Sequence, residues 1–483
     1  MFENIDPSIF LVILPEILLL VLVGLVLLFD ILWKGSKGRN LGWLTVAGIG
    51  VILIATFILA RPGDESRLVW GGMLRHDWLG FIFTIIFLFG AGITALFAME
   101  VPHLGHRGEF YLLMLITTVG MSFMASAADL IMLYLAIETA SIPLYILAGF
   151  FKTEDKSTES GFKYLLFGAL SSAVMLYGFS LLYGFSGTTD IYALAQGLLA
   201  GELSLVLLLG PLVFVLVGFG FKISMVPFHF WAPDVYEGAP TPVAGFLSTA
   251  SKAAGFAVLM RFLLAAFPET MPYWSVTIAI LATASMTLGN VLAISQKNIK
   301  RLLAYSSIAH AGYALIGVAA ATTFGITAAI FYLVVYVITN LAAFGIVAAF
   351  SRVANSEEIS EYAGLSRRSP GFSWAILITF LSLAGMPPLG GFIAKVLVFA
   401  AAMEANLVWL AVVGVINSIF GLYYYLIVLK VVFLYRSEDE GKPFPITRTY
   451  NLAFAVLIFG IILLGTVFAP WFAWSGTAAL ALF

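Results

Sequence analysis

Residues 220–255 read GFKISMVPFHFWAPDVYEGAPTPVAGFLSTASKAAG and place two lysines, Lys222 and Lys252, inside segments apolar enough to lie in lipid. Pro227 follows the first lysine by five residues and interrupts what would otherwise be a continuous helix. A charged amine in hydrocarbon is costly, and so is a helix whose backbone groups lose their partners. The stretch therefore predicts a polar site inside a membrane protein, with most of the remaining chain as its scaffold.

The composition places the chain in a bilayer. The sequence is 61% hydrophobic and 10% charged, whereas a soluble globular protein has about 25% charged residues. It contains no cysteine, which excludes disulfides, iron–sulfur clusters and thiolate metal sites. The net charge of −2 gives no bias toward nucleic acid. These features predict an all-α polytopic membrane protein, with the lipid bilayer as its solvent and no nucleic-acid partner.

The hydrophobic segments predict fourteen transmembrane helices, since a span needs about 20 apolar residues. They cover about 9–33, 41–60, 78–99, 110–127, 130–151, 162–185, 203–231, 242–267, 274–295, 302–321, 325–350, 372–403, 407–435 and 452–474. The seventh and twelfth are overlong and contain proline, which predicts discontinuous helices.

The basic residues between the spans predict the orientation. Odd-numbered connections hold sixteen of them, and even-numbered connections hold three: Arg61, Arg67 and Arg75. The sixteen are Lys34, Lys37, Arg39, Arg107, Lys152, Lys156, Lys163, Lys297, Lys300, Arg301, Arg352, Arg367, Arg368, Arg436, Lys442 and Arg448. We therefore expect both termini to lie on the non-cytoplasmic side.

Four ionisable residues lie well inside predicted spans: Glu138, Lys222, Lys252 and Lys395. Charges at such depth are functional by default. A carboxylate near Lys222 would favour the charged amine, while burial would disfavour it. A changing distance between Glu138 and Lys222 would therefore move a proton on or off the lysine. The alternative for Glu138 is a neutralised carboxylate kept for packing.

Lys252 follows serine, threonine and alanine residues that permit close helix approach and a wet lining. Its alternative is a side chain that snorkels toward the membrane surface. Arg261, nine residues further on and nearer the end of its span, is expected to snorkel.

Lys395 repeats the pattern of Lys222, because Pro387 and Pro388 precede it in a long apolar segment. The two proline-interrupted segments lie five spans apart, which predicts two inverted five-helix repeats, a design common in ion transporters. The alternative for Pro227 is a plain proline kink with no part in ion transfer.

Two histidines are candidates for proton relays, His229 after the first break and His310 between the two lysine-bearing regions. Each has an alternative as a hydrogen-bonding residue that stabilises packing. His103 and His106 lie with Glu109 at the edge of a span without further ligands, so no metal site is predicted.

Five stretches resemble the antiporter-like membrane subunits of respiratory complex I, the proton-translocating NADH:quinone oxidoreductase. They are LPEILLL at 14–20, LAIETASIPLY at 135–145, residues 220–252, QKNIKRLLAYSSIAHAGY at 296–313 and LAGMPPLGGFIAKVLVF at 383–399. The likeness is strongest to N-type members, since Lys395 stands where M-type members are expected to have glutamate.

The resemblance implies a division into residues 1–101 with three helices, repeats at 102–273 and 274–436, and a last helix in 437–483. It implies that Glu138 and Lys222 form a coupling pair, that Lys252 is the central connecting site and that Lys395 is the exit site for protons.

The resemblance also implies that this chain binds no cofactor and has no redox centre. NADH, flavin, iron–sulfur clusters and quinone would belong to partner subunits, with M-type and K-type neighbours in a bacterial plasma membrane. One alternative is a subunit of a multi-subunit Mrp-type cation/proton antiporter, which shares these motifs. Others are a self-contained transporter of an anionic solute and a related complex with a different electron donor.

Overall fold

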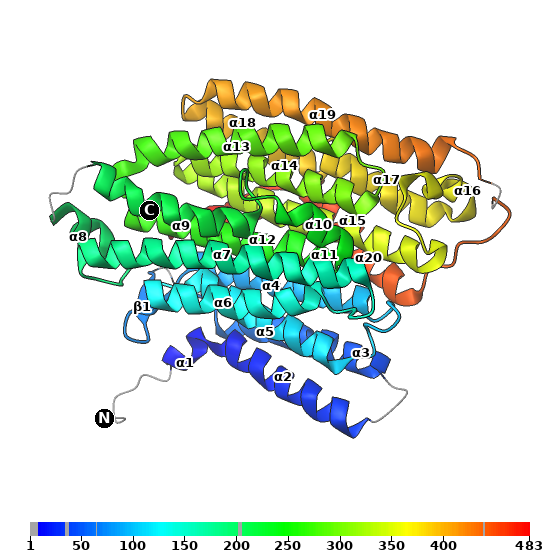
Figure 1. Cartoon of the computed structure of the whole chain (residues 1–483), viewed down its shortest axis with the longest axis horizontal. Helices are drawn as coiled ribbons and strands as arrows, with labels where there is room; N and C mark the ends of the chain where they lie inside the picture. Colours follow the sequence, from blue (N-terminus) through cyan, green and yellow to red (C-terminus); the bar gives the residue numbers. More distant parts are fainter. Residues whose placement is uncertain (1–7, 34–37, 64, 201–204, 438–439) are drawn as a thin grey trace.

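The computed structural model describes residues 8–33, 38–63, 65–200, 205–437 and 440–483. In these ranges the chain is a bundle of helices that run side by side along the longest axis, with one small hairpin, β1 (Arg67–Val69) and β2 (Leu74–His76) (Figure 1). The helices before the first break are α1 (Ser8–Val12), α2 (Leu14–Leu32), α3 (Gly38–Leu59), α4 (Trp78–Ala98), α5 (Gly108–Ser126), α6 (Leu130–Ala148), α7 (Asp155–Ser186), α8 (Leu194–Ala200) and α9 (Leu205–Ile223). Those after it are α10 (Trp231–Gly238), α11 (Thr241–Phe246), η1 (Leu247–Ser251), α12 (Lys252–Ala266), η2 (Pro268–Thr270), α13 (Met271–Ile294), α14 (Ile299–Ala320), α15 (Thr323–Ala354), η3 (Ile359–Tyr362), α16 (Leu365–Arg368), α17 (Pro370–Ala384), α18 (Gly390–Glu404), α19 (Val408–Leu434), α20 (Arg448–Thr466) and α21 (Ala469–Leu480).

The predicted all-α membrane fold is confirmed. Among the described residues, twelve helical segments are long and apolar enough to cross a membrane. The predicted seventh span is divided between α9 and α10, and the twelfth between α17 and α18, so both predicted discontinuities are present. The predicted start of the seventh span, Leu203, lies outside the described residues. The total of fourteen crossings and the inverted repeats stay predictions.

The helices differ in how much of their surface the rest of the chain covers. α4, α14, α15 and the segment from α11 to α12 are enclosed, whereas α2, α3, α7 and α19 expose much of their apolar surface. Figure 1 shows α2 at one edge of the bundle and α19 at the opposite edge. Large aliphatic side chains suit the lipid-facing helices, while polar side chains are tolerated on the enclosed ones, where neighbouring helices supply partners.

The predicted eighth span differs from a simple helix. The structure interrupts it with a π-helical segment, η1, between α11 and α12. A π-turn inserts an extra residue into the helix and is frequently found at functional sites. Lys252 is the first residue after this segment. The sequence pattern alone did not predict this change of helix type.

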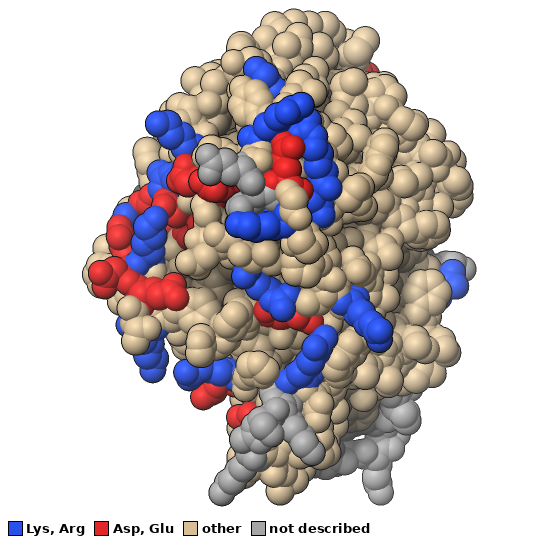
Figure 2. Space-filling view, turned by 90° about the vertical axis from the view of Figure 1, so that its right-hand side faces the viewer, with Lys and Arg blue, Asp and Glu red and all other residues tan. Residues whose placement is uncertain are grey.

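Charged side chains gather at one end of the bundle, which Figure 2 shows face on. Asp234 and Glu237, two residues of α10, join α7 to α14 there. Arg301 Nη1 lies 2.8 Å from a carboxylate oxygen of each, and Lys156 Nζ lies 2.8 Å from Glu237. The described basic residues of the odd-numbered connections lie at this end. Two others, Lys34 and Lys37, lie outside the described residues. Which side of the membrane it faces stays a prediction.

Candidate functional site

The predicted pair of Glu138 and Lys222 is brought together, but not as an ion pair. Lys222 is buried in the last turn of α9, and its Nζ donates a hydrogen bond of 2.8 Å to Ser141 Oγ. Ser141 stands one helical turn after Glu138 on α6. Glu138 is half-buried and accepts a hydrogen bond from Ser172 Oγ of α7. Lys222 therefore binds α6 through Ser141, one turn from Glu138.

The chain is non-helical between α9 and α10, the region that contains Pro227. Other groups take over the backbone hydrogen bonds that this break leaves free. Val226 N donates to Ser285 Oγ at 3.0 Å, and Trp231 Nε1 donates to the Phe221 carbonyl at 3.1 Å. The broken helix is therefore a supported element of the fold and not a frayed end.

His229 lies within this first break. Its ring is buried and stacks against Phe230 at a centroid distance of 4.5 Å. Its Nδ1 atom is buried without a hydrogen-bond partner. The structure therefore leaves a nitrogen free for a relay, and the relay role itself stays a prediction.

Lys252 is turned into the protein. Its Nζ donates to the carbonyl oxygen of Ser307 at 2.8 Å and also to Ser307 Oγ. Gly255, one turn further along α12, packs on the side chain of Lys222, since a Cβ added there would lie 3.2 Å from Lys222 Cγ. The two lysines therefore line the same contact between α9 and α12, and the snorkelling alternative for Lys252 is wrong.

Three residues on one face of α14 connect Lys252 to the second lysine region. Ser307, His310 and Tyr313 follow at intervals of three, so they lie above one another on the helix. Ser307 accepts from Lys252, and the ring of Tyr313 lies 4.8 Å from Lys395 Nζ. His310 lies between them.

The His310 ring is held at both nitrogens. Its Nδ1 lies 2.7 Å from the hydroxyl of Tyr332, and its Nε2 lies 3.3 Å from the hydroxyl of Tyr425. A cavity of about 10 Å³ lies beside the ring, where α15 meets the α17–α18 break. A neutral imidazole accepts at one nitrogen and donates at the other, so this placement permits proton relay.

Lys395 uses the second break directly. From α18 its Nζ donates a hydrogen bond of 2.9 Å to the carbonyl of Ala384, the last residue of α17. That buried carbonyl has no partner within the helix, because α17 stops before Pro387 and Pro388. Cations are favoured at the carboxyl end of a helix. The buried lysine and the broken helix, which lie near each other in the sequence, are therefore also in direct contact in the structure.

We expect Gly385→Ala to destabilise the subunit by about 1–3 kcal/mol, the usual cost of a strained backbone conformation. Gly385 has φ of +85°, and an added Cβ would lie 2.8 Å from Lys395 Cδ. Gly371→Ala in the same α17 is the matched control, because no heavy atom lies within 4 Å of its added Cβ and its φ is ordinary. Thermal unfolding of the two purified variants measures the difference, and equal stability would contradict the assigned strain.

The expectation that Arg261 snorkels is wrong. Its guanidinium is 2% exposed and binds Asp77 through two hydrogen bonds of 2.6 and 2.9 Å. It also donates to the Ala125 carbonyl at 2.7 Å and to the Tyr192 hydroxyl at 2.6 Å. Asp77 caps α4 by accepting from Gly80 N. The acid that holds Arg261 comes from a connection far away in sequence, so the arginine has no need of the membrane surface.

Sequence reasoning missed the neutral partners of the site. Ser307 and Tyr313 could have been found, since their spacing from His310 in SSIAHAGY puts all three on one helical face. Tyr332 and Tyr425 come from other helices, and no local pattern marks them.

Known proteins resemble this chain over most of its length. A family model described as "NADH:quinone oxidoreductase/Mrp antiporter, TM" matches residues 127–421. A Moorella thermoacetica protein named NADH-quinone oxidoreductase subunit N is 42% identical over 450 residues, covering 93% of this chain and 94% of that protein. NAD(P)H-quinone oxidoreductase subunit 2 of Nostoc punctiforme is 41% identical over 446 residues, covering 90% and 83%.

Solved structures give the same result. A chain of respiratory complex I from Thermus thermophilus with bound aureothin is 32% identical, with a TM-score of 0.78 over 95% of this chain and 98% of its own. A chain of the Mrp complex from Dietzia has a TM-score of 0.87 at 21% identity, over 99% and 98%, and shows the fold alone. The chain is thus a multi-pass membrane protein that belongs to the NADH:quinone oxidoreductase/Mrp antiporter family.

Proposed function

We propose that the chain is the N-type subunit of a proton-translocating NADH:quinone oxidoreductase. In this role it moves protons through Lys222, Lys252, His310 and Lys395 while electrons pass from NADH to quinone in partner subunits. The observation that carries the proposal is the buried row itself. Its members are buried side chains, and those from Lys252 to Lys395 are joined through one face of α14.

The partners of the lysines suit proton release. Lys222 donates to a serine hydroxyl, and Lys395 donates to a backbone carbonyl. Lys252 donates to the carbonyl and the hydroxyl of one serine. Among the ion pairs of the described residues none includes these three lysines. A buried charge without a counterion is costly. The charged and neutral amines can therefore exchange, which a permanent carboxylate partner would prevent.

Glu138 supplies the adjustable charge. Glu138 accepts from Ser172 and Lys222 donates to Ser141, so a shift of α6 against α9 would change the attraction between the two charges. Approach of the carboxylate would favour protonation of Lys222, and withdrawal would send the proton toward Lys252. His310, with a hydroxyl at each nitrogen, would pass it toward Lys395. His229 would serve as an additional relay at the first break.

The wider assembly follows from the same proposal. We place fourteen crossings in the chain, with inverted repeats at 102–273 and 274–436 and flanking segments at 1–101 and 437–483. This is supported by two broken segments that each carry a buried lysine. The basic end would face the cytoplasm of a bacterium, with both termini on the other side. M-type and K-type subunits would be neighbours, and NADH, flavin, iron–sulfur clusters and quinone would bind to partner chains.

We expect Glu138→Ala to lower NADH-driven proton pumping and coupled oxidoreductase activity by about tenfold or more, with assembly intact. The reason is that Lys222 would lose the charge that switches its protonation. Pumping is measured in membrane vesicles, and assembly by copurification of partner chains. Glu404→Ala, at the exposed end of α18, is the control and should pump normally. Normal coupled turnover in an assembled Glu138→Ala complex would remove Glu138 from the mechanism.

A subunit of an Mrp-type cation/proton antiporter is the second candidate, since the description of the matching family model covers both systems. The two differ in their partners and driving force. Copurifying dehydrogenase chains and NADH-dependent pumping would support the first function. Sodium/proton exchange in vesicles without NADH would support the second.

A further inference from the structure

A second polar site lies apart from the lysine row, at the end of the bundle that carries the β1–β2 hairpin (Figure 1). It is a cavity of about 30 Å³ between α2, α3, α4 and β2. That volume has room for about one water molecule. Its lining includes Glu16, Thr56, His76, Thr84 and Ser126. Such a concentration of polar groups beside lipid-facing helices calls for a physical explanation.

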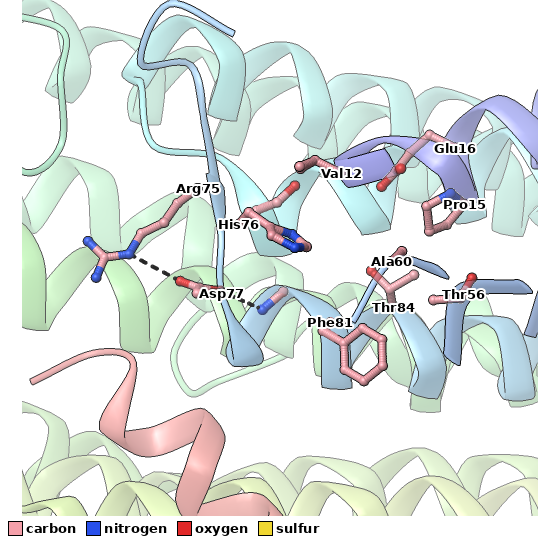
Figure 3. Close-up of a pocket in the computed structure, with 12 residues that line it drawn as sticks. Val12, Pro15, Glu16, Thr56, Ala60, Arg75, His76, Asp77, Phe81 and Thr84 are labelled. Carbon is pink, nitrogen blue, oxygen red and sulfur yellow. Dashed lines mark hydrogen bonds and ion pairs between the residues drawn. The ribbon is translucent and has the colours of Figure 1, made fainter. Parts of the chain in front are cut away.

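The carboxylate of Glu16 is the central group of this site. The residue is 5% exposed, and Figure 3 shows its carboxylate pointing into the space between His76 and Thr84. Its Oε1 accepts a hydrogen bond from Ser122 Oγ, which lies 2.8 Å from Thr84 Oγ1. Its Oε2 is buried without any hydrogen-bond partner. One oxygen is therefore anchored and the other is free to bind something in the cavity.

The number of free carboxylate oxygens around the cavity favours a proton over a metal cation. Asp77 also lines it, but both of its oxygens are bound by Arg261, and Arg75 Nε lies 3.3 Å from one of them. Glu16 thus contributes the one uncommitted carboxylate oxygen among the lining residues. A hard cation needs several oxygen ligands. A proton needs one.

His76 offers a route from outside. It lies half-buried on β2, in the connection between α3 and α4, and its ring borders the cavity opposite Glu16 (Figure 3). Burial lowers the pKa of the His76 imidazole, although the neighbouring Asp77 carboxylate opposes the shift. The ring therefore gives up a proton readily near neutral pH.

We propose that Glu16 is a proton-binding carboxylate, loaded from the hairpin end of the protein through His76 and water in the cavity. In the loading step the His76 imidazolium loses an N–H proton and the Glu16 carboxylate gains an O–H. The histidine becomes neutral and so does the acid. Any part of this site in turnover rests on the proposed function, but its protonation does not.

The test uses infrared spectroscopy of the assembled complex in membranes at neutral pH. The native protein should show a carbonyl band of a protonated carboxyl group that disappears in Glu16→Gln. It should persist in Asp30→Asn, the control at the other end of α2. After transfer to heavy water, the deuterium shift of this band should be slower in His76→Ala. Labelling of Glu16 in the native protein by a hydrophobic carbodiimide, detected by mass spectrometry, covers the case in which Glu16→Gln fails to assemble.

Each other outcome overturns part of the proposal. Native and Glu16→Gln complexes with identical spectra, or an unlabelled Glu16, would mean that the carboxylate is ionised. Loss of the band on addition of sodium would identify a cation site. An unchanged exchange rate in His76→Ala would remove the histidine route. These readouts do not use NADH turnover, so they remain informative even if the proposed pumping through the lysine row is disproved.

Discussion

Arg261→Ala is expected to destabilise the subunit by about 3–5 kcal/mol, the usual cost of removing one partner of a buried ion pair. The guanidinium is enclosed and satisfies Asp77, the Ala125 carbonyl and the Tyr192 hydroxyl at once. Its removal would leave the buried Asp77 carboxylate with Arg75 alone as a cationic partner, at 3.3 Å from the Arg75 Nε atom. When the purified complex is heated, the variant subunit should therefore begin to unfold at a temperature well below that of the native subunit.

The double variant Asp77→Ala with Arg261→Ala separates the charge from the packing. Removing both partners should recover part of the loss, since no buried carboxylate is then left without its main partner. Lys430→Ala is the matched control for loss of a cation, because Lys430 is exposed on α19 and its Nζ lies 5.4 Å from the centroid of the Tyr435 ring. It should change stability by about 0.5 kcal/mol or less. An Arg261→Ala subunit as stable as this control would contradict the structural role.

The contrast between Arg261 and Lys252 shows what the sequence can predict. Both lie on α12, and both are charges within an apolar run. The depth of Lys252 and its small, polar neighbours were enough to predict an inward-facing amine. The environment of Arg261 depends on Asp77, which lies 184 positions away and caps another helix. No local pattern carries that information, so snorkelling was the expected but wrong result.

The broken helices were predictable because proline acts locally. Pro227 and Pro387 remove backbone donors and clash with a preceding turn wherever the helix packs. The π-helical segment before Lys252, LSTAS, contains no proline and has no such marker. The partner of Lys222 is an intermediate case. The depth of both residues in their spans predicted Glu138 as its partner. The hydrogen bond from Lys222 to Ser141 depends instead on side-chain packing between α6 and α9.

Lys252→Met is expected to lower coupled proton pumping and turnover by about tenfold or more, as loss of a proton-transfer group does. Lys252 stands between Lys222 and the α14 face that leads to His310. Methionine fills a similar volume, so assembly should be retained. Only the amine and its bonds to Ser307 are lost. NADH-driven pumping in vesicles, compared with the amount of assembled complex, measures the effect.

Lys252→Arg decides whether the site needs a charge or a proton. Arginine keeps the positive charge but does not deprotonate in proteins, so a relay through this position would fail almost as severely as with methionine. Ser307→Ala is the milder control, because the Ser307 carbonyl still accepts from the lysine and only the hydroxyl contact is removed. Pumping by the arginine variant at the native rate would mean that Lys252 acts as a fixed charge. The proton would then have to cross from α9 to α14 by another route.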